Sequence, residues 1–430
     1  MMKKYFQRNI SGEAARILFL FALFSIFITL FLGLLLSNHR IFPEFKFLPF
    51  QVLRPLHTLF ALSWVINGSI ASVLAFMKVN LKAEFSWIIP ALFLTSAGFI
   101  MSGNFTGREY IAWPPFVSIV FILLFISLVF WFFASLKKAY NIFSESTWMI
   151  ALGLLLLPAS LIESNYYLFH ESISIGRDIA IEWHAIDSLF GSVNLIGYGI
   201  LSFILRKQFA DSVSSWKFQF TLMISLVGLL LTFGHHFYPS PQPSILKTVA
   251  FTASMVAIAS LWLKRFPEKS NNIDDIYITF AMYSVYWTLF SIVTGVLMSI
   301  PSINNITHGT YFVVAHSMGS LIGVNTFIIL SAIFYLTKEG YFQRADVSTN
   351  QSNNYFNKSL LLKLIFYFNI TLMIFVTILS VTGLMANMPI ESIFLSSGIM
   401  YKLIFATGSL LFALLVPIIF AAIQKLYWFK

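Results

Sequence analysis

The sequence predicts an all-α polytopic membrane protein, and three observations lead to this fold class. Hydrophobic residues make up 58% of the 430 residues and charged residues only 10%, with a mean hydropathy of +0.82. A soluble domain carries about 25% charged residues, so charge this sparse cannot cover a water-exposed surface. Apolar stretches of about 20 residues, enough to cross a bilayer, recur along the chain. We therefore expect a single transmembrane domain over residues 1–430, although the length alone would suggest two or three soluble domains.

Each apolar stretch is expected to be a helix, because the lipid core offers no other partner for backbone N–H and C=O groups. About twelve transmembrane helices are predicted, at residues 14–37, 52–77, 85–102, 113–136, 147–168, 178–205, 214–237, 245–263, 275–300, 308–336, 359–386 and 396–425. The first span has no small-residue cleavage site behind it, so we interpret it as a retained helix and not as a signal peptide.

The placement of basic residues predicts which ends of the helices face the cytoplasm. With the N-terminus inside, twenty of the 27 Lys and Arg residues fall on the cytoplasmic side. The remaining seven fall outside and are Arg40, Lys46, Arg54, Arg108, Arg177, Lys247 and Lys402. This asymmetry follows the positive-inside rule and predicts that both termini are cytoplasmic. It also accounts for the net charge of +10 through the lipid bilayer, without a nucleic-acid partner.

Cysteine is absent from the sequence. Its absence excludes disulfides, iron–sulfur clusters, thiol nucleophiles and a covalent c-type haem motif. Any metal in this protein must therefore be held by His, Met or carboxylate side chains.

Six of the eight histidines are predicted to lie at one level, in the outer part of the membrane, on four different spans. They are His57, His184, His235, His236, His308 and His316. The other two, His39 and His170, are expected in loops. A single histidine in a span is most often hydrogen-bonded to a neighbouring helix, yet it is also a functional candidate by default. Imidazoles from four helices at one level suit intramembrane haem together with a His-bound copper or iron.

Four short motifs follow one another from the second span to the tenth. They are Arg-Pro-Leu-His-Thr at 54–58 with Trp64, Gly-Arg-Glu-Tyr at 107–110 with Pro114, Gly-His-His-Phe-Tyr at 234–238, and Thr-His-Gly-Thr at 307–310 followed by Ala315, His316, Gly319 and Gly323. In this order they resemble the haem–copper oxidase superfamily, and most closely the large catalytic subunit of bacterial nitric oxide reductases. The resemblance covers nearly the whole chain. It implies a twelve-helix core in a bacterial inner membrane, with the active site toward the outer side.

The resemblance also implies cofactors and their ligands: two haem b groups, one low-spin and one high-spin, and one non-haem metal. His57 would bind the low-spin haem, and His316 would be the proximal ligand of the high-spin haem. The non-haem metal, which faces the high-spin haem, would be held by His184, His235 and His236.

Three charged residues on the outer side match the family as well. Arg54 and Arg108 would pair with haem propionates, for which bidentate guanidinium groups are well suited. Simple anchoring at the membrane interface is the alternative for both arginines. Glu109 would help to bind a calcium ion near the propionates.

The sequence departs from the family at the second ligand of the low-spin haem. Where the family has a histidine two residues after the proximal one, this chain has Met318. Positions two apart on a helix project about 200° apart, so His316 and Met318 can address haems on opposite sides of one span. His57 with Met318 would form a His/Met haem of raised potential, unless Met318 is only a packing residue.

The acidic residues depart from the family too. The reductases have a glutamate one turn after the position of His184, where this chain has Ser188, so the non-haem metal could be iron or copper. The intramembrane carboxylates that remain are Glu163, Glu182 and Asp187. An unpartnered carboxylate in a membrane is costly, so we expect these three to act in catalysis, as proton carriers or partners of the metal or propionates.

The substrate is inferred from a missing tyrosine. Oxygen reductases cross-link a tyrosine to a metal-binding histidine, and at the two usual positions this chain has Ser188 and Leu229. The chain is thus predicted to catalyse the two-electron reaction 2 NO + 2 H⁺ + 2 e⁻ → N₂O + H₂O on a small gaseous substrate. The electrons would come from a cytochrome c-type or copper-containing partner subunit, or from a quinol. The alternatives are a divergent oxygen reductase and a non-catalytic haem-binding protein or transporter.

Overall fold

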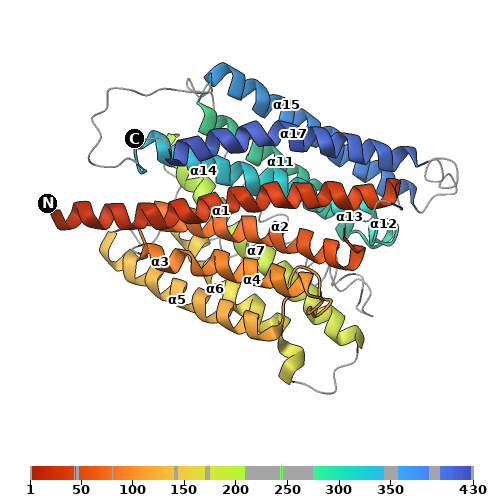
Figure 1. Cartoon of the computed structure of the whole chain (residues 1–430), viewed down its shortest axis with the longest axis horizontal. Coiled ribbons are helices and arrows are strands. Elements are labelled where there is room, and N and C mark those ends of the chain that lie inside the picture. The colour runs from red at the N-terminus through yellow and green to blue at the C-terminus, as the bar shows by residue number, and fades with distance from the viewer. Residues whose placement is uncertain are drawn as a thin grey trace.

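The computed structural model describes residues 2–42, 48–79, 81–139, 144–169, 175–208, 275–342, 357–386 and 398–427, with the single positions 44, 243 and 245. Within these residues the chain forms a bundle of long helices and has no strand (Figure 1). The long helices are α1 (Met2–Ile41), α2 (Phe50–Phe76), α4 (Ile88–Met101), α5 (Pro115–Ala139), α6 (Glu145–Ser164), α7 (Ile175–Gln208), α11 (Ile276–Ser299), α14 (Phe327–Lys338), α15 (Lys358–Met385) and α17 (Ile399–Tyr427). Short elements join them: α3 (Ala83–Ser86), η1 (Tyr166–Phe169), α12 (Pro301–Thr307), α13 (Tyr311–Met318) and η2 (Gly319–Thr326).

The all-α membrane fold predicted from the sequence is confirmed. Ten stretches of the described residues are helical, long and apolar enough to cross a membrane, and each corresponds to a predicted span. The other two predicted spans, 214–237 and 245–263, lie outside the described residues apart from single positions. The first residues of α1 and the last residues of α17 lie at the same end of the bundle, as both termini on one side of the membrane require (Figure 1).

Helix α2 and the continuous helix 311–338, made of α13, η2 and α14, form the interior of the bundle. All of the apolar window of α2 and 94% of that of 311–338 are buried, against 33% for α5 and α15. Large side chains such as Phe130 on α5 and Phe366 on α15 are exposed, and in the membrane they face lipid. The histidines at 57 and 316 are therefore carried by the two most buried helices.

Helices α6 and α7 approach each other closely along two glycines. A Cβ atom at Gly153 of α6 would lie 2.5 Å from the carbonyl oxygen of Ser192 on α7. In the other direction, a Cβ atom at Gly199 of α7 would lie 2.8 Å from the carbonyl oxygen of Ser146 on α6. Small residues allow membrane helices to pack backbone against backbone in this way. The two helices therefore hold their side chains in a fixed relative position.

The helix that carries His316 changes its winding directly after Met318. Residues Gly319–Thr326 form a π-helical segment, and α14 resumes the ordinary winding. Gly319 and Gly323 lie against Phe290 and Trp287 of α11, where a Cβ atom would lie 2.5 and 2.3 Å from the aromatic rings. His316 and Met318 themselves belong to the α-helical part, so their expected opposite directions on the helix are kept.

Candidate functional site

His57 lies in the second turn of α2, facing α1. Its Nδ1 is 2.9 Å from the carbonyl oxygen of Thr29, and its Cε1 would be 3.2 Å from a Cβ atom at Gly33. A carbonyl oxygen can only accept, so Nδ1 carries the ring proton and donates it to Thr29. The lone pair of the neutral ring is then on Nε2, the atom that could bind haem iron.

His316 has the same arrangement with a different partner. Its Nδ1 lies 2.8 Å from Oγ1 of Thr294 on α11. The hydroxyl of Thr294 donates its one proton to the carbonyl oxygen of Phe290, at 2.8 Å, so toward His316 it can only accept. Nδ1 of His316 is therefore protonated, and the lone pair is again on Nε2.

His184 lies on α7 and contacts a carboxylate of α6. Its Nδ1 is hydrogen-bonded to Oε1 of Glu163, and the two side chains are 11% and 31% exposed. A carboxylate accepts from Nδ1–H, which leaves the lone pair of the neutral imidazole on Nε2. The three described histidines that were predicted to bind haem or metal thus share one pattern, in which a neighbouring helix fixes Nδ1.

The other histidines do not join this set. His308 is exposed at the end of α12, so its predicted place at the site is not supported by its surroundings. His39 was expected in a loop but lies in α1, because that helix continues beyond the apolar span, and its Nε2 is 2.9 Å from the carbonyl oxygen of Leu48. His235, His236 and His170 lie outside the described residues.

Met318 is half-buried and packs against the hydrophobic core of the bundle. Its position at the last residue of α13 agrees with a ligand on the side of the helix opposite to His316, and it agrees with packing as well. Ligation by Met318 therefore stays a prediction.

The two arginines predicted to bind propionates are both paired with carboxylates. Arg54 on α2 donates to Glu109 at 2.9 Å, and their side chains are 54% and 26% exposed. Arg108 is only 10% exposed and donates to both carboxylate oxygens of Asp178, at 2.7 and 2.9 Å. Its guanidinium also lies over the ring of Tyr167, 4.1 Å from the centroid. These contacts tie the loop at 102–114 to α2 and to α7.

Glu182 belongs to this outer charged cluster, which consists of Arg54, Arg108, Glu109, Asp178 and Glu182. Its Oε1 accepts from the backbone N–H of Glu109 at 3.0 Å, and its Oε2 is 3.8 Å from Nη1 of Arg108. Asp178 was not among the residues predicted from the sequence. The signal that could have found it was its spacing: it precedes Glu182 by four residues and therefore lies on the same face of α7.

Tyr110 covers the inner side of the cluster. It has a positive φ of 63°, and its ring meets that of Phe190 on α7 at a centroid distance of 4.9 Å. Burial, with the adjacent Glu109 carboxylate, raises the pKa of the Tyr110 hydroxyl far above its ordinary value. This phenol is therefore neutral at physiological pH and adds no charge to the cluster.

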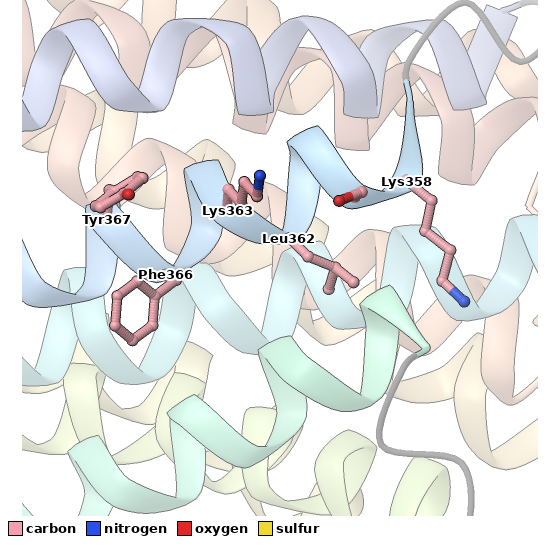
Figure 2. A pocket seen from close by; sticks show the side chains of 6 residues that line it. Lys358, Leu362, Lys363, Phe366 and Tyr367 are labelled. Atoms are coloured by element: carbon pink, nitrogen blue, oxygen red, sulfur yellow. The ribbon is translucent and has the colours of Figure 1, made fainter.

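Two further features limit what the site can be. Within the described residues, no three His, Asp or Glu side chains are grouped so that they could hold a metal ion by themselves, and this includes the calcium site expected at Glu109. A hollow of about 490 Å³ on α15 is lined by Lys358, Lys363, Phe366 and Tyr367 among others (Figure 2). It lies at the end of the bundle opposite to α12 and α13, so it is not the site formed by the histidines (Figure 1).

Comparison with known proteins identifies the family of this chain. The sequence profile of the family described as cytochrome c and quinol oxidase polypeptide I matches residues 13–423. The chain belongs to this family. Members of this haem–copper oxidase family are membrane oxidoreductases with haems and a binuclear metal centre.

Two individual relatives of this family member differ in what they are. A nitric oxide reductase chain from Stutzerimonas stutzeri is 21% identical over 364 residues, which are 76% of this chain and 75% of that protein. A haem–copper terminal oxidase, solved as a dimer by cryo-EM, has a TM-score of 0.68 at 12% identity, covering 97% of this chain and 84% of that chain. The second likeness shows the shared fold alone.

The residues present fit the cofactors that the family implies. Histidines 57, 184 and 316 have their lone pairs on Nε2, as a haem or metal ligand requires. In the outer cluster, Nη1 of Arg108 is buried and has no hydrogen-bond partner, although Nη2 makes two. A buried guanidinium N–H without an acceptor is costly, and a propionate carboxylate would satisfy it.

Proposed function

We propose that this oxidase-family member is the catalytic subunit of a nitric oxide reductase and catalyses 2 NO + 2 H⁺ + 2 e⁻ → N₂O + H₂O. The observation that carries a redox centre is the shared pattern of His57, His184 and His316, each with Nδ1 fixed by a neighbouring helix. Nitric oxide is favoured over oxygen by Ser188 and Leu229, which stand where oxygen reductases have their cross-linked tyrosine. The similarity to the nitric oxide reductase chain of Stutzerimonas stutzeri supports the same substrate.

In this proposal His57 and Met318 hold the low-spin haem b, and His316 holds the high-spin haem b. His184, His235 and His236 hold the non-haem metal, iron or copper. When bound, these groups supply one-electron transfer and coordination of the substrate. The partners of Nδ1 fix each ring, so that Nε2 points in one direction before any cofactor binds.

The charged residues on the outer side have two proposed roles. Arg108 and Arg54 hold the propionates, and Arg108 is prepared for this by its orphan Nη1. Glu182 and Asp187 on α7 carry protons between the outer surface and the site, with Glu182 in contact with the outer charged cluster. A calcium ion at Glu109 would need ligands beyond the described side chains, such as the propionates.

The chain holds no Cys for a c-type haem or an iron–sulfur cluster, so we further propose that electrons enter through a partner subunit with haem c or copper. The protein would work in a bacterial inner membrane, with both termini in the cytoplasm and the histidine level toward the outer side.

Gas analysis of the purified, reduced protein tests the proposal. With NO as the only substrate, an NO electrode and gas chromatography should record one N₂O for every two NO consumed. Oxygen consumed to water without N₂O from NO would assign the chain to the oxygen reductases instead. A protein that binds haem but turns over neither gas would be the non-catalytic alternative, and both results contradict the proposal.

A further inference from the structure

Glu163 is the described carboxylate that contacts His184, and nothing in the sequence motifs marks it. It is the penultimate residue of α6, 21 positions before His184 on the next helix. The family resemblance expects an acid one turn after His184 on the same helix, where this chain has Ser188. The acidic group next to the histidine therefore comes from a different helix.

The position of Glu163 is unfavourable for a carboxylate on its own. The C-terminal end of a helix carries partial negative charge, which disfavours an anionic side chain in the last turn. Glu163 is also two-thirds covered, with 31% of its side chain exposed. Its charge is compensated there by the N–H of His184, so the pair has a local electrostatic reason to form.

The two helices that carry the pair leave little room for it to shift. Gly153 and Gly199 bring the backbones of α6 and α7 into contact, which fixes the distance between them. Glu163 lies nearly three turns after Gly153 on α6, and His184 lies four turns before Gly199 on α7. The carboxylate and the imidazole are thus held by the rigid packing of two spans, and not by a loop.

We propose that Glu163 is a positioning residue of the non-haem metal site, which orients His184 and strengthens Nε2 as a donor to the metal. It supplies from α6 the acidic group that position 188 of α7 lacks. A carboxylate that accepts from Nδ1–H fixes the tautomer and the ring plane of a metal-binding histidine and makes its other nitrogen more basic. This role rests on the proposed metal site and replaces the expectation that Glu163 carries protons.

The test measures metal affinity in the purified, haem-loaded protein and its E163A and E163Q variants. The non-haem metal is removed with a chelator, and ferrous or cuprous ion is returned, whichever the protein contains as purified. Loss of an orienting partner costs 10–100-fold in metal affinity, so E163A should bind the ion about 10–100-fold more weakly at an unchanged haem content. E163Q keeps an oxygen that accepts from Nδ1 and should bind clearly more tightly than E163A.

A matched control is Asp275→Asn, which removes a carboxylate from the ion pair with Lys338 at the end of the bundle remote from His184. This variant should bind the metal like the wild type. Equal affinity of E163A and the wild type would overturn the inference, and so would equal weakness of E163Q and E163A, which would make Glu163 a direct ligand. A wild-type protein with haem but no further metal would contradict the proposed function as well.

Discussion

Two polar regions of this membrane protein are built on different principles. At the histidine level, each imidazole has one defined partner for Nδ1: a backbone carbonyl, a hydroxyl or a carboxylate, at His57, His316 and His184 respectively. In the outer charged cluster, two arginines and three carboxylates share their contacts. The first region fixes direction with single hydrogen bonds, and the second joins the loop at 102–114 to two helices with charge.

The difference follows from depth in the membrane. Charges are costly in the apolar interior, so neutral rings with single acceptors are the cheaper way to order a site there. Near the surface, water and headgroups reduce that cost, and a network of ion pairs can form. The comparison teaches that ligand geometry belongs to the deep region, while loop anchoring and propionate binding belong to the outer one.

The largest effect is expected at the deep region from His316→Ala, with the exposed His308→Ala as the matched control eight residues away. Because His316 is the proposed ligand of the high-spin haem, its loss should reduce the haem content from two to about one per chain and abolish NO reduction. His308→Ala should keep both. A pyridine haemochrome assay measures the haem content, and full haem content in H316A would refute the assignment.

In the outer cluster, the buried and the exposed arginine should behave differently. Arg108→Ala leaves Asp178 and Glu182 without their cation and should cost about 2–3 kcal/mol, at the lower end for buried pairs because the Asp178 side chain is 36% exposed. Arg54→Ala should cost less than about 1 kcal/mol, since that pair is largely exposed. Thermal unfolding in detergent compares the two variants, and equal losses would mean that burial does not set the strength of this network.

The packing that holds Glu163 against His184 can be probed with two glycines. Gly153→Ala places a methyl group 2.5 Å from a backbone oxygen of α7 and should cost about 1–3 kcal/mol as the helices separate. Gly98→Ala on α4 meets nothing within 4 Å and should be neutral or slightly stabilising. The melting temperatures decide, and a Gly153→Ala variant as stable as Gly98→Ala would show that α6 and α7 are not closely packed.

The smallest structural change expected is Met318→His. If Met318 ligates the low-spin haem, the substitution replaces a His/Met pair by two histidines and should lower the reduction potential of that haem. Its near-infrared charge-transfer band should change as well. A redox titration followed by optical spectroscopy measures both, and an unchanged potential and band would make Met318 a packing residue.

Much of the fold follows from composition, because apolar length alone specifies membrane helices. All ten spans of the described chain were predicted within a few residues from hydropathy. The π-helical winding after Met318 was not predicted, since it depends on how Gly319 and Gly323 meet aromatic rings of α11. The helical place of His39 was missed because α1 continues beyond its apolar stretch.

The site was predictable only in part. The histidines were found because imidazole is rare in membrane spans and because they occur in ordered motifs. Their partners were not, since Thr29, Thr294 and Glu163 are ordinary residues whose importance appears only when the helices pack. Likewise, Asp178 becomes the partner of Arg108 through a contact across 70 positions of the chain, which no local pattern encodes.

Haem and metal analysis of the purified protein tests the central claim most directly, because the claim is that fixed histidines in the membrane hold a redox centre. The account predicts two b-type haems and one further iron or copper per chain, measured by haemochrome spectra and elemental analysis of the same sample. A colourless protein without bound metal would contradict it.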